Sequence, residues 1–518
     1  MSDGSSSGRN AGARRGIAGV GGYAPRFRLT AEAVTEAWGQ FHGAGISSTA
    51  VPDADEDTLT MAYEAASRAL SAADVDPASV AGLTIGTTTP PVEEEAMAPR
   101  LASTLGLDES IRSRQLTGST RAGVDALAAG LDMGATRPDV DAARPVLVVA
   151  SDAPRGAPDD EIEHAGGAGA AALVLAAEAP GTVTDLAEHV SPYPGTRFRG
   201  HGEAETTGLG VTSYDRTAFT ETVAAAVDAL DADPAAADAV ALQSPNGKLP
   251  YRAAGPLGVE TDAIHRGTVV GDLGDLGAAS PLFGLAAAID DGADRALLVG
   301  YGSGGGATAA EVSHDGIPVE MTREGDEELS YGEYLRMRGD ITPGEPAGGG
   351  AYVSVPSWRR TIPQRHRLRA GRCPDCGALA FPPEGACNDC GGLVEYEPVE
   401  LPGTGTVEAV TVIGQGGAPP EFVDQQARSG AYASAVVALD GPDAADGADG
   451  EEGGTNDGAV SIPAQVVGTD PTAVTVGDRV AATIRRIYTQ EGVTRYGFKM
   501  QPIDRTTISL SSPGSIDI

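Results

Sequence analysis

The residues best suited to chemistry are four cysteines in the last third of the chain. Cys373, Cys376, Cys387 and Cys390 form two C-x2-C pairs, and a glycine follows each pair. Two such pairs can place four thiolates tetrahedrally around one zinc ion. Four thiolates leave no open position for water, so we predict a structural rather than a catalytic zinc. An iron centre or a redox dithiol is the alternative that the spacing leaves open.

These four residues are all the cysteines of the chain. If all four bind zinc, no thiol remains in the first 372 residues. The larger part of the chain therefore has no cysteine nucleophile.

A basic segment, Trp358–Arg372, directly precedes the first cysteine pair. It contains six arginines and one histidine: Arg359, Arg360, Arg365, Arg367, Arg369, Arg372 and His366. A charge run is usually structural, so we favour an arm that docks onto an acidic main domain. The alternative is a phosphate site for a nucleotide-like ligand such as coenzyme A (CoA), with Arg359, Arg360, Arg365 and Lys248 as candidate contacts.

Apolar strand-like runs and Ala-rich helical stretches alternate twice in the first 345 residues. Expected strands are Gly16–Val20, Gly82–Gly86, Pro145–Ala150, Gly169–Ala176, Ala239–Leu242 and Arg295–Tyr301; expected helices are Thr58–Ala73, Arg121–Gly130, Thr220–Ala229 and Pro281–Asp290. This pattern predicts a layered α/β domain built as two related halves.

The pattern changes at the turn-rich stretch Pro343–Gly350, a natural domain boundary. Five short strand-like runs follow the cysteines and predict a small all-β barrel: Gly405–Ile413, Ala431–Leu439, Ala459–Val467, Arg479–Ile487 and Arg495–Pro502. We therefore expect a disordered tail (1–14), a main domain (15–345), a basic connecting segment (346–372), a zinc ribbon (373–395) and a barrel domain (396–510) with a disordered acidic insertion (441–458).

Acidic residues dominate the composition. The chain has 73 Asp and Glu against 36 Lys and Arg, for a net charge of -37. The acid is spread along the chain, as in Asp53–Asp57, Asp159–Glu163, Asp231–Asp238 and Glu324–Glu328. Such a surface keeps a protein hydrated in concentrated salt and is typical of haloarchaeal proteins. An ordinary acidic protein of a high-GC bacterium is the alternative.

The same composition bears on partners and location. An acidic field repels phosphate backbones, so we expect no nucleic-acid partner. No stretch has the roughly 18 consecutive apolar residues of a membrane span. The start, MSDGSSSGRNAGARRG, lacks the apolar core of a secretory signal. We therefore expect a cytoplasmic protein without a membrane partner.

Two stretches resemble known families. Residues 359–392 and Tyr496–Pro502 (YGFKMQP) resemble acyl-CoA-associated zinc-ribbon/OB-fold proteins. The N-terminal part resembles the thiolase superfamily, in particular archaeal hydroxymethylglutaryl-CoA (HMG-CoA) synthase. The matching pieces are Gly19–Arg28, Asp55–Ala65, Pro245–Lys248, Gly277–Leu285, Tyr301–Gly304 and Tyr331–Ile341. The resemblance implies a thiolase-like α/β domain, a rubredoxin-like zinc ribbon and a small OB-type barrel.

The resemblance also implies enzymes that condense acyl-CoA esters. They use a cysteine that carries the acyl group, a histidine beside it and a Glu or Asn that completes the site. The aligned positions in this chain hold Thr120 (or Ser119) for the cysteine, Gln243 for the histidine, Thr88 for the acid and Asp275 for the asparagine. A threonine hydroxyl with no histidine beside it is a weak substitute for a thiolate.

Other residues could replace the missing groups. Glu93, Glu94 and Glu95 lie near the missing acid, although a solvated charge run is the favoured interpretation. His164 and His201 each lie near glycines and could face a site, although a lone histidine is more often structural.

Two functions follow from these expectations. The favoured one is a non-catalytic thiolase-fold scaffold that binds CoA or acyl-CoA and bridges an active thiolase or HMG-CoA synthase. The alternative is an active condensing enzyme of isoprenoid or acyl-CoA metabolism with a non-cysteine site. Thiolase folds usually assemble, so we expect a homodimer or a complex with such a partner.

Overall fold

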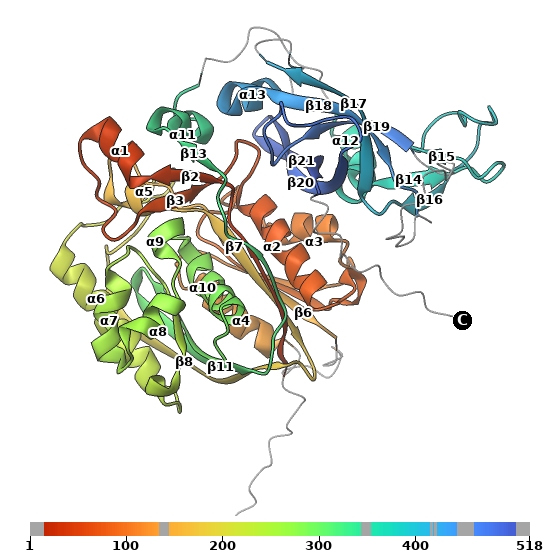
Figure 1. The fold of residues 1–518 in the computed structure, drawn as a ribbon. Coiled ribbons are helices and arrows are strands. Elements are labelled where there is room, and N and C mark those ends of the chain that lie inside the picture. The colour runs from red at the N-terminus through yellow and green to blue at the C-terminus, as the bar shows by residue number, and fades with distance from the viewer. Residues whose placement is uncertain are drawn as a thin grey trace, which may run out of the picture.

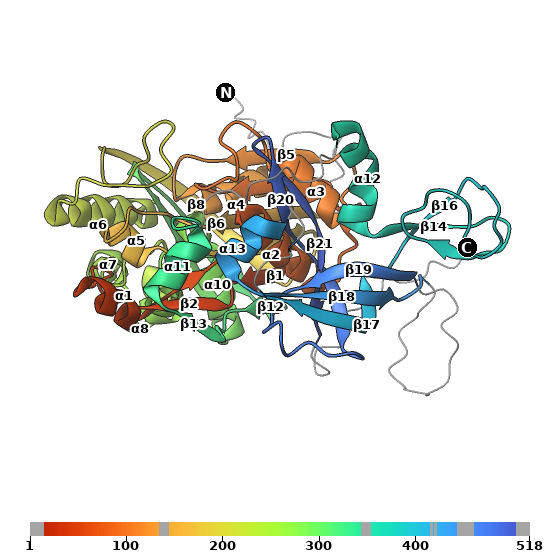
Figure 2. The same cartoon turned by 90° about the horizontal axis from the view of Figure 1, so that it is seen from above.

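The computed structural model describes residues 15–133, 144–342, 354–414, 418, 422–442 and 460–503. The expected tail and most of the expected acidic insertion lie outside these residues. The described chain forms a large layered α/β domain, a small cysteine-containing ribbon and a barrel (Figures 1 and 2). No described helix is both long and apolar enough to cross a bilayer.

A ten-stranded sheet organises the α/β domain. Its order is β5-β4-β6-β7-β1-β8-β11-β10-β9, and β12 pairs in parallel with β1. The strands are β1 (Gly16–Tyr23), β4 (Gly82–Gly86), β5 (Arg112–Leu116), β6 (Val146–Asp152), β7 (Gly169–Ala176), β8 (Gly181–Tyr193), β9 (Ala239–Leu242), β10 (Arg295–Gly302), β11 (Gly304–His314) and β12 (Val319–Thr322). A smaller sheet joins β13 (Glu327–Leu329), β2 (Phe27–Thr30) and β3 (Ser48–Val51).

Helices cover both faces of the large sheet and also pack on the smaller sheet. They are α1 (Ala31–Trp38), α2 (Thr58–Ala72), α3 (Ala98–Leu105), α4 (Ala122–Asp132), α5 (Glu161–Ala165), α6 (Thr212–Asp228), α7 (Leu249–Leu257), α8 (Thr261–Arg266), α9 (Val270–Leu273), α10 (Ser280–Asp290) and α11 (Tyr331–Arg338), with short 3-10 turns η1 (Pro77–Ser79), η2 (Pro234–Ala236) and η3 (Gly277–Ala279).

Strand β6 shows how the layers form, because its side chains alternate between two cores. Val146 and Val148 pack with α4 and α10, whereas Leu147 and Val149 pack with α2 and α3. Strands β9 and β10 repeat the pattern, with α4 and α10 on one face and α6, α7 and α8 on the other. The α4–α10 pair is thus a central layer between the two halves of the sheet (Figure 1).

The basic segment forms helix α12 (Val355–Arg367) and strand β14 (Arg369–Arg372). Strand β14 pairs with β15 (Leu379–Ala380) and β16 (Glu397–Glu400) to build the ribbon. Helix α12 contacts α3: the Ser103 Oγ and His366 Nδ1 atoms are 2.9 Å apart, and Arg367 donates to the Thr104 carbonyl. These are the contacts of an arm docked on the main domain, and Figure 2 shows the ribbon projecting beyond it.

The barrel is closed by five strands in the order β17-β18-β19-β21-β20. They are β17 (Thr404–Ile413), β18 (Tyr432–Leu439), β19 (Val460–Val466), β20 (Arg479–Gln490) and β21 (Val493–Pro502), with helix α13 (Val423–Ser429) between β17 and β18. Each contains most of a run expected from the sequence. Val407, Val437, Val480 and Met500 belong to its apolar core.

The barrel docks on helix α2 of the main domain through buried charges. Arg485 Nη1 lies 2.8 Å from Glu64 Oε1, and Lys499 Nζ lies 2.7 Å from Asp55 Oδ2. Tyr496 donates to Asp57 at 2.6 Å. The prediction that the acids of 53–57 belong to a dispersed acidic surface is wrong for Asp55 and Glu56, which are only 2% and 6% exposed. The partner of Asp55 is more than 400 residues away, so the pattern of one segment does not reveal it.

Candidate functional site

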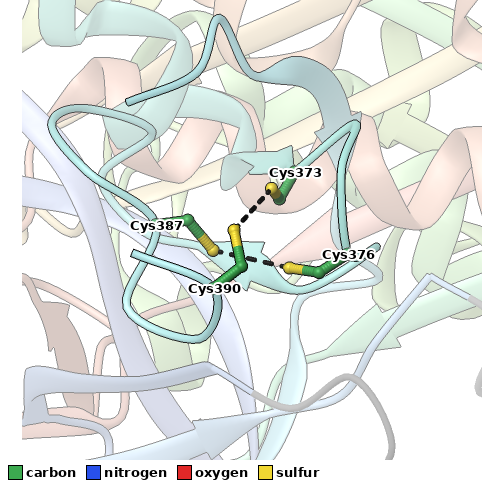
Figure 3. Close-up of side chains that lie close together, drawn as sticks. All are labelled: Cys373, Cys376, Cys387 and Cys390. Carbon is green, nitrogen blue, oxygen red and sulfur yellow. Dashed lines mark hydrogen bonds between the residues drawn. The ribbon is translucent and has the colours of Figure 1, made fainter. Parts of the chain in front are cut away.

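The four cysteines converge at the tip of the ribbon (Figure 3). Cys373 and Cys390 have their Sγ atoms 3.8 Å apart, and those of Cys376 and Cys387 are 3.6 Å apart. All four sulfurs lie within 4.8 Å of one another. Tetrahedral Zn–S bonds of about 2.3 Å require sulfurs about 3.8 Å apart. The cysteines present therefore fit one zinc ion.

Two matching turns hold these sulfurs. The N–H of Cys373 donates to the Ala378 carbonyl and that of Cys387 to the Gly392 carbonyl, both at 2.8 Å. Gly377 and Gly391 close the turns with φ of 79° and 75°, a backbone conformation that side chains disfavour. The four ligands leave no position for a substrate, so a zinc bound here would stabilise the ribbon without doing chemistry.

The second candidate site lies where the family's catalytic positions align, in the main domain. Thr120 lies two residues before α4 and is 4% exposed. Its hydroxyl donates to the Tyr301 carbonyl at 2.7 Å. The atom that Thr120 contacts is a backbone carbonyl oxygen, which cannot act as a base. A hydroxyl whose proton is already donated to a carbonyl is poorly prepared for nucleophilic attack.

Gln243 and Asp275 are in direct contact. Gln243 Nε2 donates to Asp275 Oδ1 at 3.0 Å, and the N–H of Gly277 donates to the same oxygen. Arg197 forms an ion pair with the other oxygen, Oδ2. Both carboxylate oxygens of Asp275 therefore already have partners. Two other buried atoms of this cluster, Gln243 Oε1 and Arg197 Nη2, have no hydrogen-bond partner among the described residues.

Thr88 donates hydrogen bonds to a buried acid, Asp152, which was not predicted from the sequence. Asp152, at the end of β6, is fully buried and accepts six hydrogen bonds of 2.7–2.9 Å. The donors are the hydroxyls of Thr87, Thr88 and Thr89, the N–H groups of Thr88 and Thr89, and the N–H of Ala278. These donors occupy both oxygens of the Asp152 carboxylate. The sequence feature that could have identified Asp152 is the apolar strand β6, which ends in Ser-Asp.

The structure links these positions into one network. Asp152 Oδ2 binds both Thr88 and Ala278, and Ala278 follows Gly277, which binds Asp275. Thr120 lies beside this network, because helix α4, which follows it, packs against η3. The packing is so close that a Cβ on Gly123 of α4 would lie 2.0 Å from the Ala278 carbonyl oxygen. Thr88, Asp275 and Gln243 therefore share a buried hydrogen-bonded cluster, with Thr120 at its edge.

The candidate phosphate contacts do not converge. Lys248 is exposed at the start of α7, whereas Arg359 and Arg360 are exposed on α12, in a distant part of the molecule (Figure 1). Arg365 stacks over the Trp358 ring, with 4.4 Å from its guanidinium carbon to the ring centroid. Lys248 and these arginines cannot bind the same phosphate group.

The alternative acids and histidines lie elsewhere. Glu93, Glu94 and Glu95 are exposed, as expected for a solvated run, and Glu95 pairs with Arg100. His201 is exposed on a loop. His164 is buried in α5, where it contacts His42 rather than Thr120.

Comparisons with known proteins divide the chain at its basic segment. The family described as "ChsH2, rubredoxin-like zinc ribbon domain" matches residues 360–395. The family described as "ChsH2, C-terminal OB-fold domain" matches residues 398–485. The predicted zinc ribbon and OB-type barrel are therefore confirmed as folds.

The main domain matches curated synthases. The hydroxymethylglutaryl-CoA synthase of Methanopyrus kandleri is 31% identical over 360 residues, which cover 63% of this chain and 97% of that protein. The synthase of Pyrobaculum calidifontis is 29% identical over 354 residues, with 62% and 97% covered.

Solved structures confirm the thiolase-like fold. A structure titled "HMG_CoA synthase complexed with CoA" has a TM-score of 0.56 at 17% identity, covering 66% of this chain and 94% of that one. Another, "MvaS in complex with 3-hydroxy-3-methylglutaryl coenzyme A", has a TM-score of 0.54 at 21% identity, with the same coverage. The fold agrees with the 31% identity to the Methanopyrus kandleri synthase, of which 97% is covered. The chain therefore belongs to the hydroxymethylglutaryl-CoA synthase family, and it carries a zinc ribbon and an OB-fold barrel after the synthase-like domain.

Proposed function

We propose that this protein is a non-catalytic member of the family, which binds CoA esters and bridges an active thiolase or HMG-CoA synthase. One observation carries the proposal: the hydroxyl of Thr120, which the resemblance aligns with the acyl-carrying cysteine, is engaged with the Tyr301 carbonyl. The only thiols of the chain are the four in the ribbon.

The neighbouring groups support the loss of catalysis. Proton transfer needs a base within hydrogen-bond reach of the nucleophile. Gln243 does not titrate and is bound to Asp275, while Asp275 is paired with Arg197. Asp152 is held by six donors. Each group that could act as a base is thus committed to another contact.

Binding of CoA esters is supported by the fold. The titles of two structures with this fold name bound CoA or HMG-CoA. Gln243 Oε1 and Arg197 Nη2 are a buried acceptor and a buried donor without partners among the described residues, and both flank Asp275. In this proposal the ester binds in the main domain, and the ribbon and barrel contact the active partner.

The assembly is either a homodimer or a complex with that partner. Strand β5 ends the described order of the large sheet, so one of its backbone edges is free for another chain. The protein works in the salt-rich cytoplasm that its charge of -37 favours. Light scattering in molar potassium chloride and mass spectrometry of co-purifying proteins test these assignments.

The test of the central proposal is intact-mass analysis after incubation with acetyl-CoA in molar potassium chloride. We expect no covalent adduct and no condensation with acetoacetyl-CoA, while calorimetry detects binding of CoA or acetyl-CoA. The Thr120→Cys variant is the matched control for detection of an acyl-enzyme. An acetyl adduct on the wild-type chain, lost in Thr120→Ala, would establish the alternative, an active condensing enzyme. Absence of CoA and acetyl-CoA binding would overturn the scaffold proposal.

A further inference from the structure

A buried imidazole contacts the middle of the loop 39–47, which connects α1 to β3 and whose ends are bonded through Gln40 to Asp159 and through Ser47 to Gly271. His164 is 1% exposed and stacks on both Phe41 and His42, with ring centroids 5.4 and 5.3 Å away. Its Nδ1 accepts a hydrogen bond of 2.9 Å from the backbone N–H of His42. The loop is therefore attached to α5 through a titratable side chain.

This hydrogen bond determines where the proton of the neutral ring lies. Because Nδ1 is an acceptor, the proton is on Nε2. That atom faces Asp159 Oδ1 at 3.7 Å and Glu163 Oε2 at 3.8 Å, while His42 Nε2 faces the same Asp159 oxygen at 3.9 Å. His42, Asp159 and His164 lie close enough to share a metal ion. A metal on Nε2 of His164 would require the proton on Nδ1, against the His42 N–H, so we assign no metal there.

A second proton on His164 would break the attachment. It would have to bind Nδ1, which would then present an N–H to the N–H of His42. Burial and the neighbouring His42 lower the pKa of His164, although Asp159 and Asp160 oppose this. The remaining facing carboxylate, Glu163, is already bound to Arg338 and Tyr331 of α11. The surroundings thus favour the neutral ring.

The loop also contacts the turn that follows Gln243. The N–H of Gly247 donates to the Ala44 carbonyl at 2.9 Å. Gly45 packs so closely that a Cβ on it would lie 3.0 Å from the Gly247 carbonyl. Asn246 Oδ1 in this turn accepts from the N–H of Lys248 and so begins α7. Release of the loop would remove one support of this turn.

We propose that His164 is a proton-operated latch. When neutral, it holds the loop 39–47 against the turn 246–248; when protonated, it releases the loop and leaves the turn without that support. The latch belongs to the main domain, and it operates whether or not CoA esters bind there.

Hydrogen exchange of the full-length protein in molar potassium chloride tests the latch. Protection of peptides covering 39–47, corrected for intrinsic exchange rates, is measured at steps from pH 7.5 to pH 5. Because the pKa of His164 is lowered while the loop is attached, we expect the protection of the wild-type loop to fall by up to tenfold for each pH unit below the ordinary histidine pKa of about 6.5, and to level off below the lowered pKa. Peptides of β6 and α10 should keep their protection, which excludes general acid unfolding.

Two variants isolate the responsible group. His164→Asn places an amide oxygen near the position of Nδ1 without a titratable ring, so its loop should stay protected at every pH. His42→Asn keeps the backbone N–H that His164 accepts, so its loop should still open on acidification. The latch is refuted if wild-type protection does not change with pH, or if His164→Asn loses it as the wild type does.

Discussion

Arg197 Nη1 donates to Oδ2 of Asp275 across 78 residues of chain, inside the cluster where the family's catalytic positions align. The Arg197 and Asp275 side chains are only 14% and 2% exposed. In this chain, a largely buried ion pair therefore lies among the positions that the resemblance aligns with catalytic residues.

Removal of Arg197 tests the structural importance of this pair. Arg197→Met leaves the Asp275 carboxylate buried without its cation, and breaking a buried pair costs about 3–5 kcal/mol. Denaturant unfolding at fixed potassium chloride concentration measures the loss. The double variant Arg197→Met/Asp275→Asn, which also removes the stranded charge, should recover much of it. A loss below about 0.5 kcal/mol, as at ordinary surface sites, would contradict the assigned burial.

Thr120→Val separates a structural from a catalytic role of the hydroxyl. The valine keeps the shape but leaves the Tyr301 carbonyl without its donor, which costs about 1–3 kcal/mol of unfolding free energy. Calorimetry should show acetyl-CoA affinity within about threefold of the wild type, a difference of under 1 kcal/mol. A CoA-ester turnover that Thr120→Val abolishes would make Thr120 catalytic after all.

Lys499 fixes the barrel to the main domain. Its Nζ binds Asp55 Oδ2 and Gln425 Oε1, both at 2.7 Å. Lys499→Met should lower the unfolding free energy by about 3–5 kcal/mol, because Asp55 becomes a buried unpaired charge. Lys248→Met, at an exposed lysine, is the matched control and should change stability by less than about 0.5 kcal/mol. Equal effects of the two changes would mean that the barrel does not dock as described.

Asp53 makes the stability pH-dependent. Burial, together with Asp55 and Glu56, raises the pKa of Asp53 to about 7. A raised pKa in the folded state means that the protonated form is favoured, so this contribution is present at low pH and is lost as pH rises through about 7. Asp53→Asn mimics the protonated form. It should be more stable than the wild type above pH 7 and similar near pH 4, as thermal unfolding at several pH values would show.

The exposed Asp290→Asn change is the control for the loss of one negative charge. In that variant, any effect should be independent of pH between 5 and 8. If the two variants respond to pH in the same way, Asp53 is not the group responsible.

The ribbon should contain one zinc ion per chain, measurable by elemental analysis of the purified protein. Cys387→Ser should lower this ratio and loosen the ribbon, because a structural zinc site supplies folding free energy directly. The near-ultraviolet circular dichroism of the main domain should persist, because its apolar cores contain no ribbon residue. Iron in place of zinc would contradict the assignment.

Parts of the fold follow from local pattern alone. Gly82–Gly86, Gly169–Ala176 and Ala239–Leu242 are strands with the predicted bounds, because each is an apolar run that ends abruptly. Helix α6 was expected at Thr220–Ala229 but begins at Thr212, since its first turns are polar and partly exposed. The zinc ligands were predictable because the four cysteines lie within 18 residues and their spacing fixes the geometry.

The main-domain site depends on long-range contacts that local pattern does not contain. Asp152 meets Thr88 across 64 residues, and Arg197 comes from a loop with no recognisable motif. The resemblance indicated which positions align with the family's catalytic residues. It did not reveal that new partners now occupy those positions.

Helix α2 links the stability of the main domain to that of the barrel. Glu64 of this helix faces Arg485 and Thr483 of the barrel, and Ile484 and Tyr496 complete the apolar cluster of α2. A main domain without the barrel would leave Glu64 with Arg68 as its remaining cation partner and would expose the apolar surface that the barrel covers. Removal of the barrel would therefore destabilise the main domain as well, so the two domains depend on each other for stability.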